Sequence, residues 1–151
     1  MLRRKARKES IQFVFAETLF DGGLEPRFNI LIEIENGRIK SLCCLNVKAI
    51  PLNVLKAPIV APGFIDIQIN GAMDRQFTDD PTIETIEAIA TGARQGGTAH
   101  VLPTFTTAPG ETYLKALRAV EAAVTVGVPG ILGMHLEGPF LSPEKPGIHS
   151  V

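Results

Sequence analysis

The segment Phe64-Ile-Asp-Ile-Gln-Ile69 decides the fold of this chain, because it begins a repeated order of strands and helices. Its polar and apolar residues alternate, which is typical of a β-strand with two different faces. Because each helical connection that follows is long enough to bring the chain back in the same direction, the order predicts an α/β fold with parallel strands. The predicted elements are a helix with Asp80 as its N-cap and Pro81 at its first position, ended by Gly96-Gly97; a strand at Thr98–Leu102; a helix from about Pro109 to near Gly127; and a strand at Gly130–His135.

Both predicted helices carry apolar residues at helical spacing, so we expect each to bury one face against the sheet. The stripe of the first helix is Ile83, Ile86, Ile89, Ala90 and Ala93, and that of the second is Leu114, Leu117, Val120 and Val124.

The residues before this region have a different, β-rich pattern. Short apolar runs flank Asn36-Gly37, a pair that is typical of a tight hairpin turn. We therefore predict a small β-rich portion at residues 9–58 and a series of β/α units at residues 59–151, with Ile59 and Val60 leading into the first of these units.

Charge and composition limit the classes of function. The chain has 15 basic and 16 acidic residues, but five of the basic residues lie within positions 1–8, which we predict to be a disordered basic leader. The remainder is acidic and is therefore a poor binder of nucleic acid. No stretch is long and apolar enough to predict a membrane span. The two cysteines, Cys43 and Cys44, are adjacent and badly placed for an unstrained disulfide, which favours a reducing, cytoplasmic location.

Polar residues gather where the predicted parallel strands end, which is where the sites of such sheets lie. Asp66, Gln68 and Asn70 share one face of the first strand, although they could simply bond to their own loop. Glu137 follows the third strand at a position suited to a metal ligand, but a helix cap or an exposed acid has the same appearance. His149 lies in a proline-rich loop and by itself is typical of a surface histidine. The other polar residues at these strand ends are Thr104, Thr106, Thr107 and His135.

Several longer motifs together resemble the N-acetylglucosamine-6-phosphate deacetylases of the amidohydrolase superfamily. The most specific is His135-Leu-Glu-Gly-Pro-Phe140, and its order and spacing relative to Pro62-Gly-Phe-Ile-Asp66 make coincidence implausible. The segments that carry the resemblance are Asn36–Ile39, Ala61–Gly71, Gly96–Thr107, Gly133–Pro143 and Lys145–His149.

The resemblance implies a metal-dependent (β/α)8 barrel, preceded by a small β-sandwich assembled from both chain ends, that removes acetate from N-acetylglucosamine 6-phosphate. By position, Glu137 resembles the metal ligand, and Gln68-Ile69-Asn70 replaces the His-x-His of most amidohydrolases. Gln68 would hold water or substrate near the metal, with Asn70 beside it, while His149 and the backbone of Ile148 would contact the sugar. The implied cofactor is one divalent ion, zinc in the first place, with iron, cobalt or manganese as alternatives.

In that family the catalytic Asp and two metal-binding His residues lie further along the chain. The resemblance is therefore to an N-terminal portion, which we expect to be inactive by itself because three such strands cannot close an eight-stranded barrel. We expect a homo-oligomer with a small amino sugar phosphate as its ligand and neither nucleic acid nor membrane as a partner. Two other functions fit the residues: a catalytically empty sugar-phosphate binding protein, and an amidohydrolase acting on another amide.

Overall fold

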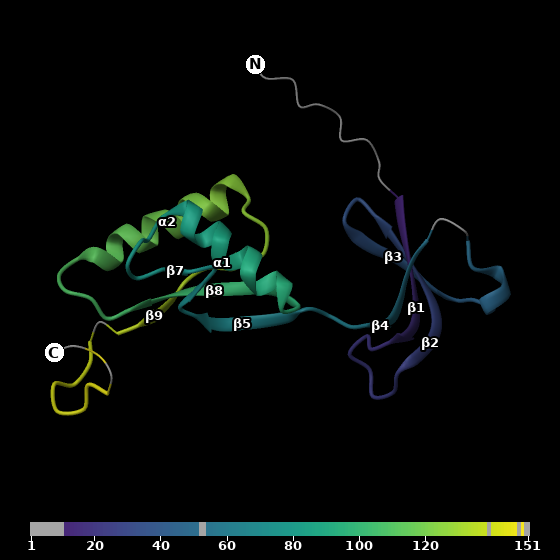
Figure 1. Ribbon diagram of the computed structural model, residues 1–151, viewed down its shortest axis with the longest axis horizontal. Helices are drawn as coiled ribbons and strands as arrows, with labels where there is room; N and C mark the ends of the chain where they lie inside the picture. Colours follow the sequence, from purple (N-terminus) through teal and green to yellow (C-terminus); the bar gives the residue numbers. More distant parts are fainter. Residues whose placement is uncertain (1–10, 52–53, 139, 148, 150–151) are drawn as a thin grey trace, which may run out of the picture. The chain divides into compact units, whose positions relative to one another are not determined.

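The computed structural model describes residues 11–51, 54–138, 140–147 and 149, and the chain divides into two compact units between Pro62 and Gly63. Each unit has its own sheet (Figure 1). The predicted basic leader, residues 1–8, and the predicted sugar contact Ile148 lie outside the described residues.

The first unit is a four-stranded sheet in the order β3-β2-β1-β4. The strands are β1 (Ile11–Leu19), β2 (Arg27–Glu35), β3 (Arg38–Cys44) and β4 (Leu55–Val60), and a short 3-10 helix, η1, spans Val47–Ala49. β1 pairs with β2 antiparallel and with β4 parallel. Asn36 and Gly37 both have positive φ, 53° and 76°, which confirms the predicted hairpin turn. Ile59 and Val60 are the last residues of β4 and pair with β1, so they belong to the sheet of the first unit. The sequence pattern had assigned them to the second unit.

The core of the first unit is small. Its buried residues are Ala16, Leu19, Ile30 and Ile32. Thr18 pairs with Phe28 on one side and Ile59 on the other, and these two side chains remain 58% and 65% exposed. The apolar face of this sheet is therefore only partly covered by the described residues.

The second unit is an α/β unit around a three-stranded parallel sheet in the order β5-β8-β9. The strands are β5 (Phe64–Ile69), β8 (Thr98–Thr106) and β9 (His135–Glu137), and a two-stranded pair is formed by β6 (Gly71–Ala72) and β7 (Arg75–Gln76). The helices α1 (Ile83–Gln95) and α2 (Thr112–Val126) lie on one side of the sheet (Figure 1). The α/β class with parallel strands is therefore confirmed.

The start of α1 differs from the prediction. Its N-cap is Thr82, whose hydroxyl accepts a hydrogen bond from the backbone N–H of Thr85. Asp80 instead lies just before the helix, where its carboxylate accepts hydrogen bonds from the hydroxyls of Thr82 and Thr85 and from Arg75. Pro81 consequently precedes the helix. The local sequence predicted that the helix begins at Asp80-Pro81. In the structure the buried Thr85 hydroxyl donates a hydrogen bond to the Asp80 carboxylate, and Asp80 therefore does not cap the helix.

The core of the second unit forms between the helices and the sheet, around Phe77, Ile86, Ile89, Val101 and Phe105. The rings of Phe77 and Phe105 meet edge to face with centroids 6.4 Å apart. Within α2 the buried residues are Ala116, Val120 and Ala123, whereas Leu117 and Val124 of the predicted stripe are 41% and 51% exposed. Because alanine side chains are small, they allow α2 to pack closely against its neighbours. The buried face of α2 is therefore rotated away from the stripe of larger residues that the sequence predicted.

The third predicted strand also begins later than expected. Only His135–Glu137 forms β9, and Ile131 makes an isolated bridge to Val101. Within the part of the chain that the structure describes, neither helix has the length and apolar character needed to cross a membrane.

Candidate functional site

Gln68 and Glu137 meet at the carboxyl end of the parallel sheet. Gln68 comes from β5 and Glu137 is the last residue of β9, so the two lie 69 positions apart in sequence. The Nε2 amide of Gln68 donates a hydrogen bond of 3.2 Å to Oε2 of Glu137. The contact forms because β5 and β9 lie on the two sides of β8 and run parallel to it, so their carboxyl ends meet at one edge of the sheet.

His149 approaches the other oxygen of the same carboxylate. Its Nε2 lies 3.4 Å from Oε1 of Glu137, and the two side chains are 12% and 30% exposed. The backbone N–H of His149 donates a hydrogen bond to the carbonyl of Pro146 at 3.1 Å. The contact is an ion pair only when the imidazole is protonated. The Glu137 carboxylate therefore has a different partner on each oxygen.

The remaining predicted residues lie at the same edge with less direct contacts. Asn70 follows β5 and is half-buried, and its carbonyl accepts the backbone N–H of Phe77 at 2.9 Å. Asp66 is also half-buried, and its carboxylate accepts the backbone N–H of Gln68 at 3.0 Å. His135 lies with Nδ1 3.3 Å from the buried Thr104 hydroxyl. Among the described residues, the side chains recorded in contact with the Glu137 carboxylate are thus those of Gln68 and His149.

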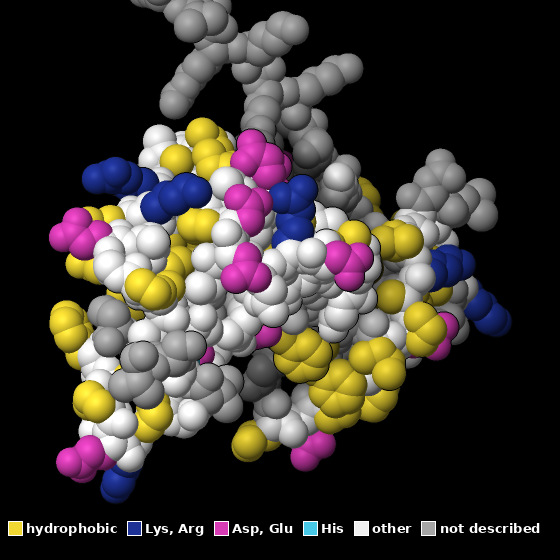
Figure 2. All heavy atoms as spheres, turned by 60° about the vertical axis from the view of Figure 1, so that its left-hand side comes forward, with side chains coloured by type: hydrophobic (Ala, Val, Ile, Leu, Met, Phe, Trp, Pro, Cys, Tyr) yellow, Lys and Arg dark blue, Asp and Glu magenta, His cyan; other side chains and the backbone are white. Residues whose placement is uncertain are grey.

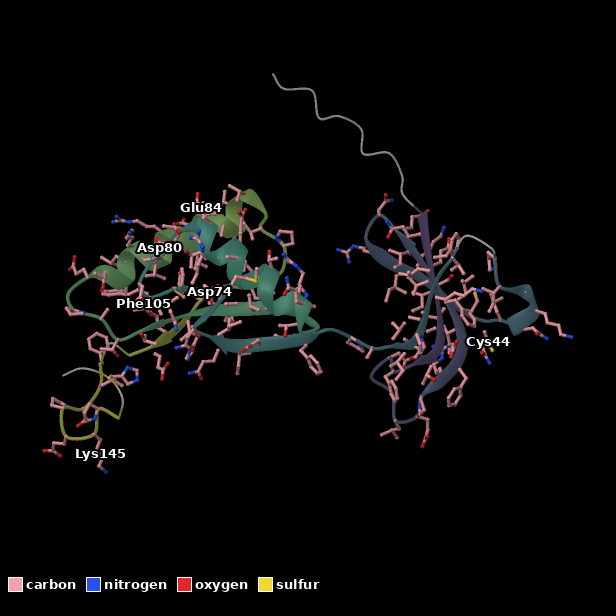
Figure 3. All side chains as sticks on the ribbon, in the orientation of Figure 1. Cys44, Asp74, Asp80, Glu84, Phe105 and Lys145 are labelled. Carbon is pink, nitrogen blue, oxygen red and sulfur yellow. The ribbon has the colours of Figure 1, made fainter. Side chains whose placement is uncertain are left out.

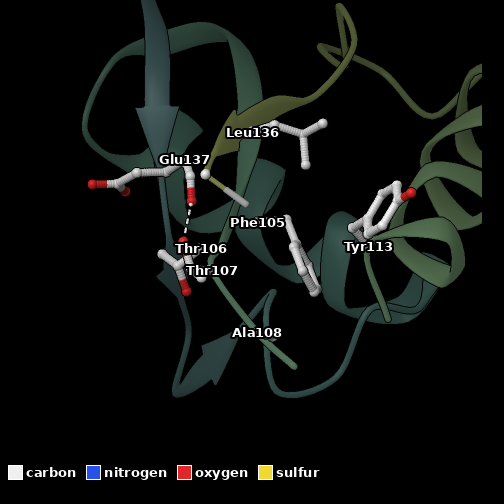
Figure 4. A pocket seen from close by; sticks show the side chains of 8 residues that line it. Phe105, Thr106, Thr107, Ala108, Tyr113, Leu136 and Glu137 are labelled. Atoms are coloured by element: carbon white, nitrogen blue, oxygen red, sulfur yellow. Dashed lines mark hydrogen bonds between the residues drawn. The ribbon is translucent and has the colours of Figure 1, made fainter. Parts of the chain in front are cut away.

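Sequence reasoning placed Thr107 at this edge without giving it a role. In the structure its hydroxyl donates a 3.0 Å hydrogen bond to the backbone carbonyl of Glu137 (Figure 4). A shallow crevice lies beside this contact, lined by Phe105, Thr106, Thr107, Ala108, Tyr113, Leu136, Glu137 and Gly138. No sequence pattern signals the contact, because it joins residues 30 positions apart in two strand ends.

The donor chemistry of this edge suits part of a metal site. A carboxylate oxygen, an imidazole nitrogen and an amide oxygen are all groups that bind zinc or other first-row transition metals. Across residues 11–51, 54–138, 140–147 and 149, no group of three or more His, Cys, Asp or Glu residues gathers in a way that could hold a metal ion. By its chemistry, the Glu137 carboxylate is able to supply one ligand of such a site.

Comparison with known proteins gives a consistent result, although no family model matches the chain. Over 95 residues the chain is 42% identical to an N-acetylgalactosamine-6-phosphate deacetylase of Shewanella, covering 63% of this chain and 24% of the relative. Over 97 residues it is 43% identical to an N-acetylglucosamine-6-phosphate deacetylase of mouse, covering 60% and 23%. The chain therefore spans about a quarter of the length of these relatives.

A solved structure extends the similarity to nearly the whole chain. The N-acetylglucosamine-6-phosphate deacetylase of Pasteurella multocida superposes with a TM-score of 0.75 and 27% identity, covering 93% of this chain and 38% of that one. These three relatives are all amino sugar phosphate deacetylases by name.

Proposed function

We propose that this chain is part of an N-acetylglucosamine-6-phosphate deacetylase, a hydrolase that yields glucosamine 6-phosphate and acetate. The observation that carries the proposal is the convergence of Gln68 and His149 on the two oxygens of Glu137, at the carboxyl edge of a parallel sheet. The names of the relatives support the substrate class, an acetylated amino sugar phosphate. An empty binding protein draws no support from these names, whereas the name of the Shewanella relative, an N-acetylgalactosamine-6-phosphate deacetylase, supports an amidohydrolase for another amide.

Glu137 is proposed as the ligand of one divalent ion, zinc in the first place, with iron, cobalt or manganese as alternatives. A bound divalent ion lowers the pKa of its water and polarises an amide carbonyl, which is the chemistry that deacetylation needs. Because the carboxylate lies at a strand end and is 30% exposed, it can be reached from solvent and yet be held in place.

Gln68 and His149 are proposed to act on either side of this carboxylate. The Gln68 amide N–H holds Oε2 of Glu137, which leaves the Gln68 carbonyl oxygen free to accept a hydrogen bond from water or substrate. The His149 imidazole can donate to a sugar or phosphate oxygen next to the metal position. Asn70 and the backbone of Ile148 complete the proposed sugar contacts. The proton-transferring Asp and the other metal ligands are proposed to come from outside these 151 residues.

The finer architecture is also a proposal: the second unit is the beginning of a (β/α)8 barrel and the first unit is one sheet of a β-sandwich. Two facts support it. β5 and β9 are the outer strands of the three-stranded sheet and so have one pairing edge each open among the described residues. Ile65 and Ile67 of β5 are 59% and 67% exposed, which suits strands that pack against further parts of a barrel.

The location and assembly are proposed on similar grounds. Cys43 and Cys44 are both free and exposed, which fits a reducing compartment such as the cytoplasm. A homo-oligomer is proposed because the exposed apolar side chains of both units favour further association.

The decisive experiment measures acetate release by the full-length protein from a panel of substrates. The panel contains N-acetylglucosamine 6-phosphate, N-acetylgalactosamine 6-phosphate, unphosphorylated N-acetylglucosamine and a cyclic amide. We expect the highest kcat/KM for the first sugar phosphate, loss of activity on chelation and recovery on adding Zn²⁺. Preference for the galactose isomer would change the sugar but keep the chemistry. Turnover of the cyclic amide alone, or binding of sugar phosphate without acetate release, would overturn the proposal.

A further inference from the structure

We propose that Thr107 is a positioning residue for Glu137: its hydroxyl fixes the backbone from which the carboxylate projects, and so sets how tightly the protein holds its metal. This inference rests on the proposed function, because it takes Glu137 as a metal ligand. It adds a residue that does not contact the carboxylate itself. The contacts that carry it lie at the ends of β8 and β9 (Figure 4).

The first contact is the hydrogen bond from Thr107 to Glu137. The Thr107 Oγ1 hydroxyl donates to the Glu137 carbonyl oxygen at 3.0 Å. Glu137 pairs with Thr106 at the end of the two strands, and Thr107 is the first residue after β8. β9 contains three residues and has β8 as its partner within the described sheet. Such a short strand has few ladder hydrogen bonds, so a side-chain contact at its last residue matters more than it would in a long strand.

The second contact is the close approach of Gly138 to Thr107. Gly138 has a φ of +103°, a conformation that side chains rarely adopt, and a Cβ built on it would collide with the Thr107 hydroxyl and lie 3.2 Å from Thr107 Cβ. The chain therefore turns directly over the Thr107 side chain as it leaves Glu137. Thr107 holds the Glu137 carbonyl and also limits where the next residue can go.

The third contact ties the end of β8 itself. The backbone N–H of Thr106 donates to the Thr78 hydroxyl at 2.9 Å, and the two hydroxyls of this pair are also 2.9 Å apart. Thr78 lies in the connection between β7 and α1, which precedes β8 in the sequence, whereas β9 follows β8. The end of β8 is thus anchored to the α1 connection through Thr106 and to Glu137 through Thr107.

These contacts have a chemical consequence for a metal ligand. The carboxylate of Glu137 is held at its tip by Gln68 and His149 and at its backbone by Thr107. Groups that orient a ligand without touching the metal commonly change metal affinity or activity by about 10- to 100-fold when they are removed. Thr107 is the hydroxyl in the described structure that holds the backbone of Glu137, so we expect it to have an effect of this size.

The test compares Thr107→Val with Thr107→Ser in the full-length protein. Valine keeps the branched shape and removes the hydroxyl, whereas serine keeps the hydroxyl. Thr112→Val is the matched control, because the Thr112 hydroxyl also donates to a backbone carbonyl, that of Pro109 at 3.1 Å, at the start of α2. The readouts are the Zn²⁺ dissociation constant from chelator competition, the visible absorption spectrum of the Co²⁺-loaded protein, and the thermal midpoint.

For Thr107→Val we expect Zn²⁺ to bind about 10- to 100-fold more weakly and the Co²⁺ spectrum to change. Thr107→Ser should return both readouts to within about threefold of the parent, and Thr112→Val should leave both unchanged. A parent-like Zn²⁺ affinity and Co²⁺ spectrum in Thr107→Val would overturn the inference, as would a serine variant as weak as the valine variant.

Glu137→Gln, measured in parallel, separates the two proposals. If it loses Zn²⁺ while Thr107→Val does not, only the inference fails and the metal role of Glu137 stands. If Glu137→Gln keeps Zn²⁺ at the parent affinity, the metal role fails, and the inference that depends on it fails too.

Discussion

At the scale of single residues, the Glu137 carboxylate brings together three parts of the second unit. Its two oxygens contact Gln68 from β5 and His149 from the C-terminal loop, and its backbone contacts Thr107 after β8. A carboxylate with a partner on each oxygen has little rotational freedom, and a divalent ion is best bound by ligands that are already oriented. The three contacts therefore hold the Glu137 carboxylate in one orientation, which is what its proposed role as a metal ligand needs.

The first prediction concerns Glu137 itself. In the full-length protein, Glu137→Gln should lower bound metal and reduce deacetylation by at least about a hundredfold, because a neutral amide is a weak ligand for a divalent ion. Metal content measured by plasma mass spectrometry, together with acetate release, checks this. Glu121→Gln, an exposed position on α2, serves as the control and should leave both values unchanged. Unchanged metal content and an unchanged rate of acetate release in Glu137→Gln would contradict the proposal that Glu137 is a metal ligand.

The second prediction separates His149 from the metal. His149→Ala should lower kcat/KM for the sugar phosphate by about 10- to 100-fold, the effect of losing a hydrogen bond to a charged group worth about 1.5–3 kcal/mol. Metal content should stay near that of the parent. His100→Ala, exposed in β8, provides the comparison. If metal is lost to the same extent as in Glu137→Gln, the 3.4 Å contact between His149 and Glu137 marks a second metal ligand instead of a substrate contact.

At the scale of elements, the start of α1 is stabilised by a network around Asp80. Figure 3 labels Asp80 and Glu84 near this end of the helix, where Glu84 lies in the first turn. The hydrogen bond from the Thr85 hydroxyl to the Asp80 carboxylate is the largest influence on its pKa, and with Thr82, Arg75 and Lys115 it holds that pKa below the ordinary value of 3.8. Partial burial acts in the opposite direction. The network links the connection before α1 to the helix itself.

The third prediction follows from the direction of this shift. A carboxyl group with a lowered pKa stabilises the folded state at pH values above its unfolded pKa, near 3.8, and this stabilisation is lost as the pH falls through the lower folded pKa. Asp80→Asn should therefore lower the thermal midpoint of the full-length protein by a few degrees at pH 7, and the difference from the parent should shrink as the pH falls below 3.8. Calorimetry across this range checks the result. Asp79→Asn removes the same charge at the neighbouring exposed position and should have a smaller effect at pH 7.

An equal loss of stability in Asp80→Asn at pH 7 and at pH 2 would contradict the third prediction. It would show that the shape of the side chain, and not its charge, stabilises the start of α1.

At the scale of the whole molecule, much apolar surface is exposed in both units. Figure 2 shows groups of hydrophobic side chains on the visible surface. In the first unit Leu55 and Ile59 are 69% and 65% exposed, and in the second Phe64 and Ile67 are 71% and 67% exposed. At about 25 cal/mol per Å² of apolar surface buried, such side chains favour association with another protein surface. Among the described residues β5 and β9 each have one edge without a strand partner, and such edges favour association in the same way.

The fourth prediction concerns the 151-residue chain by itself. We expect it to release no acetate, because one candidate ligand cannot hold a catalytic zinc, which typically takes about three protein ligands. We also expect it to be poorly stable as an isolated monomer and to associate with copies of itself or with a polypeptide that supplies the rest of the fold. Size-exclusion chromatography with light scattering and an acetate assay check both parts. A compact monomer with a cooperative melt would contradict the stability claim, and metal-dependent turnover would contradict the catalytic claim.

The sequence by itself determined the α/β class, the order of strands and helices, and the Asn36-Gly37 hairpin. These features depend on neighbours a few residues apart: alternation along a strand, helical spacing, and the preference of Gly for positive φ. The resemblance also identified the relatives, because their motifs are continuous segments such as His135–Phe140. The roles of Glu137, Gln68, Asn70 and His149 remain predictions.

The tertiary structure alone decided which helix faces are buried, where α1 begins, and which side chains meet. Ala116 and Ala123 face the core in place of Leu117 and Val124 because packing depends on how closely α2 can approach its neighbours. The contacts of Gln68, His149 and Thr107 with Glu137 likewise depend on the order β5-β8-β9 and on the paired ends of β8 and β9. Local sequence could not give these contacts, because they join residues far apart in the chain and form only when the strands pair in one register and the core between sheet and helices is packed.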